Sequence, residues 1–97
     1  MLVPSVCLWE FAMMVTRGEV SLNAGLYGEI VETMLAPDNV SLQELTPAIA
    51  LRAAQLSMVR RMDPADQLIA ATALEFRSPL FSTDERLRAI PGLEIIW

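Results

Sequence analysis

Apolar residues recur along the chain with helical spacing and predict four helices. The expected helices cover residues 4–18, 26–35, 46–56 and 63–76. The first is apolar on nearly every side, so we expect it to be well buried and to end at Gly18. In the second, Leu26, Ile30 and Met34 form an i, i+4, i+8 stripe, which is typical of a helix that packs on one face.

Two of these helices begin with a side chain that can cap a helix, followed by proline. Thr46 precedes Pro47, and Asp63 precedes Pro64. A threonine or aspartate side chain can accept a hydrogen bond from the first turn, and proline suits the first helical position. We therefore predict that Thr46 and Asp63 are N-caps.

Short apolar runs between and after the helices predict strands. They cover residues 40–45, 79–83 and 93–97, and a brief helix is expected over residues 84–90. Strands separated by helices indicate an α/β layer fold with a mainly parallel sheet. Asp84 follows the strand of residues 79–83 directly, at the strand end where open α/β sheets bind ligands.

The composition is that of one small globular domain. The chain has 97 residues, and 54% of them are hydrophobic, which excludes intrinsic disorder. The longest apolar run, VCLWEFAMMV, contains Glu10, and it is shorter than the roughly 20 residues of a membrane span. No secretory signal pattern is present. We expect a soluble, cytoplasmic protein that does not enter a membrane.

The residue types that are absent restrict the chemistry. There is no histidine and one cysteine, which argues against Ser-His-Asp triads, most zinc sites and disulfides. Cys7 lies between Val6 and Leu8, so an inert, buried thiol is favoured over a nucleophile. The net charge of −5 argues against loose, charge-driven binding of nucleic acid, although arginine, the only basic residue type, suits local phosphate contacts.

Carboxylates are the chemistry that remains, and each has a structural alternative. Asp63 could serve as no more than a cap, and Asp84 likewise. Asp66 falls at the third helical position, where it could complement the helix dipole, yet Ile69, Ala70 and Ala73 follow on its face. That apolar face leaves a functional role for Asp66 equally open.

Glu10 is unusual for the same reason. It lies between Trp9 and Phe11 in the most apolar helix, where a buried carboxylate needs a partner or a metal; an exposed stripe that contains it is the alternative. Together these residues suggest an acidic pocket. Clustered carboxylates favour hard cations such as Mg²⁺ or Mn²⁺, and such ions promote phosphodiester hydrolysis.

Four segments also carry a resemblance to a known family. They are SVCLWEFAMMVTRGEVSL, LTPAIALRAAQL, DPADQLIAATALEFRSPLFSTDERL and PGLEIIW. In this order they resemble PIN-domain proteins, and in particular the VapC-type toxins of bacterial toxin–antitoxin modules. The resemblance implies a three-layer α/β/α sandwich around a mainly parallel sheet.

The resemblance also implies an activity and a set of residues. It implies a Mg²⁺-dependent (or Mn²⁺-dependent) endoribonuclease, with Glu10, Asp66 and Asp84 as catalytic metal ligands and Asp63 as a weaker ligand. RNA as substrate, a cognate antitoxin and a homodimer are the implied partners. Arg60 and Arg61, which precede the acidic motif, are candidate RNA contacts, with solvated surface charge as the alternative.

The first strand of the family has no counterpart in the residues quoted. Family members begin with a short apolar strand that carries an aspartate, whereas here Met1 is followed almost at once by PSVCLWE. We therefore expect residues 1–97 to form an N-terminally truncated PIN-like domain with impaired catalysis. The alternative function is that of a non-catalytic remnant that binds a second copy or an antitoxin. A different phosphoryl-transfer fold is disfavoured because no P-loop is present.

Overall fold

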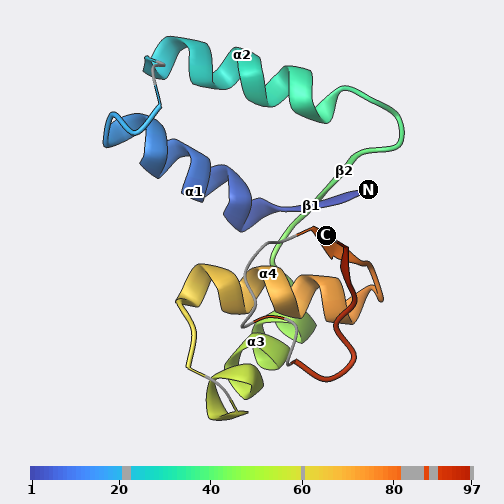
Figure 1. Cartoon of the computed structure of the whole chain (residues 1–97). Helices are drawn as coiled ribbons and strands as arrows, with labels where there is room; N and C mark the ends of the chain where they lie inside the picture. The colour runs from blue at the N-terminus through green and yellow to red at the C-terminus, as the bar shows by residue number, and fades with distance from the viewer. Residues whose placement is uncertain (21–22, 60, 82–86, 88–89, 97) are drawn as a thin grey trace. The chain divides into compact units, whose positions relative to one another are not determined.

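The computed structural model describes residues 1–20, 23–59, 61–81, 87 and 90–96 (Figure 1). The chain divides into two compact units, Met1–Glu44 and Leu45–Trp97. Each unit is described by itself below. The prediction that residues 1–97 form a single domain stays a prediction.

The first unit contains two strands and two helices. In chain order they are β1 (Leu2–Pro4), α1 (Ser5–Thr16), α2 (Ala24–Leu35) and β2 (Ser41–Gln43). Strands β1 and β2 pair in parallel, with Leu2 opposite Ser41. Helices α1 and α2 follow one another in this unit (Figure 1), and the Tyr27 hydroxyl ties them by donating a hydrogen bond of 2.7 Å to the Leu8 carbonyl.

Both helices of this unit lie where the apolar pattern places them. Helix α1 is followed by Gly18, whose φ of +74° is a conformation that glycine adopts without cost, so the predicted stop is confirmed. Helix α2 begins after Asn23, whose side chain accepts a hydrogen bond of 3.0 Å from the Leu26 N–H.

The prediction that α1 is well buried is wrong. None of its residues is buried, and Trp9 is 57% exposed. Within this unit α1 packs against α2 and β1, and two such small elements cover only part of a helix surface.

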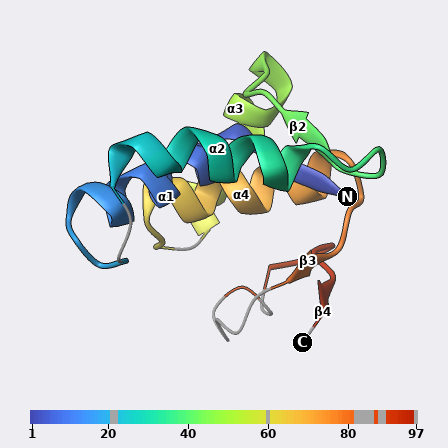
Figure 2. The same ribbon diagram turned by 90° about the horizontal axis from the view of Figure 1, so that it is seen from above.

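The described residues of the second unit form two helices and two strands. They are α3 (Pro47–Val59), α4 (Pro64–Glu75), β3 (Leu80–Phe81) and β4 (Ile95–Ile96). Strands β3 and β4 pair in parallel, and the Leu80 N–H donates to the Glu94 carbonyl at 2.8 Å (Figure 2). The predicted helix of residues 84–90 lies outside the described residues except for Leu87 and Ile90.

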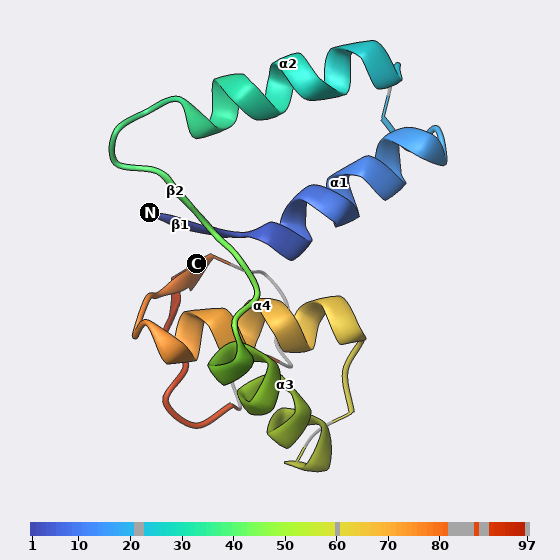
Figure 3. The same ribbon diagram turned by 180° about the vertical axis from the view of Figure 1, so that it is seen from behind.

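The core of the second unit lies along α4, because alanines let neighbouring chain segments approach closely. Helices α3 and α4 lie side by side (Figure 3), and Ile49 and Ala53 of α3 pack against Ala71 of α4. On another side of α4, Ala70 packs with Leu87 and Ile90. The buried Thr72 hydroxyl is satisfied by donating a hydrogen bond of 2.7 Å to the Leu68 carbonyl.

The fold class is confirmed at the coarse level. Helices and strands are mixed, and both strand pairs are parallel, as in a PIN-like α/β fold. The three-layer sandwich and the truncation stay predictions. Within the described part of the chain, no helix is long and apolar enough to span a membrane.

Candidate functional site

Asp66 lies in the first turn of α4, at the third helical position. Its side chain is half-buried, and Ala70 and Ala73, which follow on the same face, are buried. The predicted apolar face is therefore real. The carboxylate is held at the edge of this face, at the positive end of the helix dipole, where negative charge is favoured.

Glu10 lies in the middle of α1 and is also half-buried. It follows Cys7 by one helical turn. The pKa of the Cys7 thiol is raised above its ordinary value of 9.0, first by burial and then by the negative charge of Glu10. The Glu10 carboxylate is thus close enough to influence this thiol, and the raised pKa agrees with the prediction that Cys7 is not a nucleophile.

Contacts from α2 fix the helix turn that carries Glu10. Tyr27 reaches the Leu8 carbonyl on one side of Glu10, and its ring lies against the Phe11 ring on the other, with 5.4 Å between ring centroids. Residues two before and one after Glu10 are therefore anchored. This anchoring limits the movement of the carboxylate between them.

Asp63 occupies the N-cap position of α4, but its side chain makes no capping hydrogen bond. Its backbone carbonyl accepts the first helical bond, from the Gln67 N–H at 3.0 Å. The predicted position is right and the predicted capping bond is wrong; the Asp63 side chain is exposed. Thr46 caps α3 as predicted, because its hydroxyl oxygen accepts a hydrogen bond of 3.2 Å from the Ile49 N–H.

Of the remaining candidate residues, the structure describes only Arg61. Arg61 is exposed, as either a phosphate contact or a solvated charge would be. Arg60 and Asp84 lie outside the described residues. Within the described ranges no group of three or more acidic or cysteine side chains is close enough to hold a metal, and Glu10 and Asp66 belong to different units. The convergence of Glu10, Asp66 and Asp84 stays a prediction.

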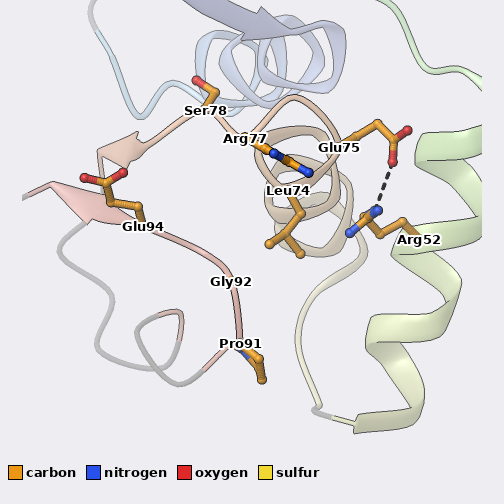
Figure 4. Close-up of a pocket in the computed structure, with 8 residues that line it drawn as sticks. All are labelled: Arg52, Leu74, Glu75, Arg77, Ser78, Pro91, Gly92 and Glu94. Carbon is orange, nitrogen blue, oxygen red and sulfur yellow. Dashed lines mark hydrogen bonds and ion pairs between the residues drawn. The ribbon is translucent and has the colours of Figure 1, made fainter.

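Sequence reasoning missed a second group of charged residues, at the other end of α4. A pocket of about 520 Å³ lies there, lined by Arg52, Leu74, Glu75, Arg77, Ser78, Pro91, Gly92 and Glu94 (Figure 4). Arg52 forms an ion pair with Glu75, with 3.0 Å between Nε and Oε2. These residues come from three separate stretches of sequence, so no local pattern announces the pocket.

A family model described as PIN domain matches residues 1–93 of the chain. No curated protein matches the chain.

Proposed function

Because the chain belongs to the PIN-domain family, we propose that it is a metal-dependent endoribonuclease of the VapC toxin type. The family match over residues 1–93 is the observation that carries this proposal. PIN-domain membership indicates a nuclease, and PIN domains generally depend on a divalent metal. RNA is the proposed substrate, and the cytoplasm is the proposed place of action.

The donor chemistry of the chain fits such a metal. Glu10, Asp66 and Asp84 would hold the ion, with Asp63 as a weaker ligand, and carboxylate oxygens are the donors that Mg²⁺ and Mn²⁺ prefer. When bound, the ion supplies positive charge that polarises a phosphate and favours ionisation of water. The half-burial of Glu10 and Asp66 supports this role, because partly desolvated carboxylates benefit most from a neutralising cation.

The residues of the chain would position the metal ligands and contact the RNA strand. Asp66 is fixed in the first turn of α4, and Glu10 lies on a turn anchored by Tyr27. Asp63, exposed and free of a capping role, faces solvent where it can reach an incoming ion. Arg60 and Arg61 would contact phosphates of the RNA strand.

Asp66→Asn is the sharpest test, because it keeps the shape of the side chain and removes its charge. Because catalysis by this chain is expected to be impaired, we expect its residual cleavage of a single-stranded RNA in millimolar Mg²⁺ to fall further, by up to about 10²-fold, the cost of a misplaced reacting group. Asp38→Asn, an exposed change outside the proposed site, is the matched control. Equal cleavage rates for wild type and Asp66→Asn would remove Asp66 from the mechanism.

A second function, association with another protein, is favoured by a surface of α2. Tyr27 of this helix packs on α1, yet the adjacent stripe of Leu26, Ile30 and Met34 is only partly covered, and Met34 is 50% exposed. We refer to Leu26, Ile30 and Met34 as the α2 stripe. Apolar stripes of this kind receive partner helices.

Charge indicates which partner fits the α2 stripe. Residues 1–44 contain six acidic residues and one arginine, Arg17. Two of the acids, Glu29 and Glu32, are exposed on α2 itself. A second copy would place acid against acid, so the proposed occupant is a basic amphipathic helix, such as a cognate antitoxin would provide, rather than the partner of a homodimer.

Met34→Ser tests this second function, with Met58→Ser, at a position 86% exposed in the other unit, as control. We expect a synthetic lysine-rich amphipathic peptide to bind wild type and the control, and to bind Met34→Ser at least about tenfold more weakly. Sedimentation of the chain alone distinguishes a homodimer. A Mg²⁺ titration without binding near millimolar metal would favour this function over the nuclease.

A further inference from the structure

We propose that the pocket at the C-terminal end of α4 binds a ribonucleotide unit, with Arg52 and Arg77 holding its phosphate. This site lies at the opposite end of α4 from Asp66, and its described lining contains neither Asp63 nor Asp66. It therefore stands or falls separately from the nuclease proposal. The described residues that line the pocket all belong to the second unit.

The backbone of Arg77 is the first observation. Helix α4 ends in a Schellman motif, in which the Ser78 N–H donates to the Ala73 carbonyl at 2.9 Å and the Arg77 N–H donates to the Leu74 carbonyl at 3.2 Å. This motif places Arg77 at the left-handed position, with φ of 51°. Glycine normally occupies that position because a Cβ is strained there.

An arginine kept at a strained position needs a compensating role. The negative end of the helix dipole favours its charge, but that effect does not require a pocket. Among the described residues Arg77 forms no ion pair, and its side chain lines the pocket. Strain at a residue that lines a cavity is a recognised mark of a binding position.

The charged groups of the pocket suit an anionic group, such as a phosphate, that is bonded to a polar group. In Figure 4, Arg52 and Glu75 lie on one side of the pocket and Glu94 on the other, with Arg77 and Leu74 drawn between them. Arg52 is engaged by Glu75, but both side chains are partly exposed, so their ion pair is weak and a phosphate dianion can compete for the guanidinium. Arginine forks match phosphate oxygens in a bidentate manner.

The other side of the pocket suits a sugar and a base. Glu94 offers a carboxylate that accepts hydrogen bonds from ribose hydroxyls or base amino groups. Leu74, Pro91 and Gly92 supply an apolar surface, and a Cβ added at Gly92 would lie 3.6 Å from a Leu74 methyl, so the backbone packs closely there. The phosphate meets the like charge of Glu75, as the carboxylates of an acidic peptide would, but the hydroxyl and amino groups of a nucleotide supply hydrogen-bond donors to Glu94, which favours the nucleotide.

The test uses the full chain in EDTA, so that metal-dependent cleavage plays no part. Adenosine 5′-monophosphate and a 5′-phosphorylated tetraadenylate are titrated while backbone amide NMR shifts are followed. We expect saturable shifts at residues 75–78 and 92–94, and weak or no shifts with adenosine, which lacks the phosphate. Tighter binding of the tetranucleotide would identify an RNA strand as the source, and equal binding would identify the free nucleotide.

Arg77→Gly separates binding from folding. Glycine relieves the left-handed strain, so we expect the midpoint of thermal unfolding to stay unchanged or to rise by about 4 °C. Affinity for adenosine 5′-monophosphate should fall by about tenfold or more, because a charge-assisted contact is lost. Arg17→Gly, which removes an equal charge outside the pocket, should bind as wild type does.

Three results would overturn the proposal. One is the absence of saturable shifts with either phosphorylated ligand. Another is unchanged affinity in Arg77→Gly. The third is a loss of stability in Arg77→Gly together with the loss of binding, which would assign Arg77 a role in the fold alone.

Discussion

At the scale of single residues, the thiol of Cys7 reports the charge of its neighbour. Its pKa is raised above 9.0 by burial and by Glu10, so little thiolate exists at pH 8. Glu10→Gln removes the charge and leaves the burial, which is the larger cause, so we expect alkylation by iodoacetamide at pH 8, in EDTA, to become faster. Glu19→Gln, at an exposed position after α1, is the control and should react as wild type does.

The same pKa has a consequence for stability, whose sign follows from proton binding. The folded chain holds the Cys7 proton more tightly than the unfolded chain does, because the folded pKa is the higher one. Between the two pKa values the unfolded state binds fewer protons, so the thiol lowers stability as pH rises above 9.0. Urea unfolding in EDTA at pH 8 and pH 10 measures this decline, which Cys7→Ala should reduce.

Thr46 and Asp63 both stand at N-cap positions before a proline, but substituting them should change the stability of the fold unequally. The Thr46 hydroxyl accepts a hydrogen bond from the Ile49 N–H at 3.2 Å, whereas the Asp63 side chain makes no capping bond. Thr46→Ala should lower the free energy of unfolding by about 1 kcal/mol, and Asp63→Ala by less than about 0.5 kcal/mol. Urea denaturation of both variants measures the difference. Equal losses would show that the Asp63 carboxylate does stabilise α4.

At the scale of elements, the contact between α3 and α4 depends on one large side chain. Ile49 is 1% exposed and packs against Ala71 and Ala53. Ile49→Ala should lower the free energy of unfolding by about 2–4 kcal/mol, because the removed atoms leave a cavity between helices. Leu51→Ala, on the same helix at a position 61% exposed, should cost less than about 1 kcal/mol. A similar loss for both would place the helix contact elsewhere.

The helices were predictable because their signals are local. Thr46 with Pro47 marks the start of α3, and Asp63 with Pro64 marks that of α4, before any tertiary contact forms. Strand β1 was missed for the opposite reason. Its three residues end in a proline and become a strand by pairing with residues 41–43, and such a pairing has no signature in a short run.

The candidate site also has a part that local sequence predicts and a part that depends on tertiary contacts. Asp66 was predicted to lie in the first turn of α4 because it is three positions after Asp63 in the sequence. The buried alanines confirm the apolar face on which it lies. The pocket that contains Arg77 was missed, because nothing in the sequence marks a left-handed arginine, although Pro79 indicates that the helix ends nearby. Convergence of distant side chains is a tertiary property, and local spacing carries no information about it.

At the scale of the whole molecule, charge and burial are divided between the two units. Residues 45–97 contain six acidic and six basic residues, so the entire net charge of −5 belongs to residues 1–44. The described residues that are buried all lie in the second unit, where Ile49, Leu87 and Ile90 belong to its core. The first unit combines self-repulsion with half-exposed apolar side chains, which leaves little net stability.

This division predicts different behaviour of the two units as separate fragments. A fragment of residues 45–97 should unfold cooperatively in urea, because its helices share a buried core, although at this size its stability is small. A fragment of residues 1–44 should show weak helicity without a cooperative transition, and added salt should increase its helicity by screening its acidic residues. Circular dichroism of both fragments measures these differences. A cooperative transition in residues 1–44 alone would mean that the pairing of β1 with β2 and the Tyr27 contacts are sufficient to fold the unit, and that burial is a poor guide to its stability.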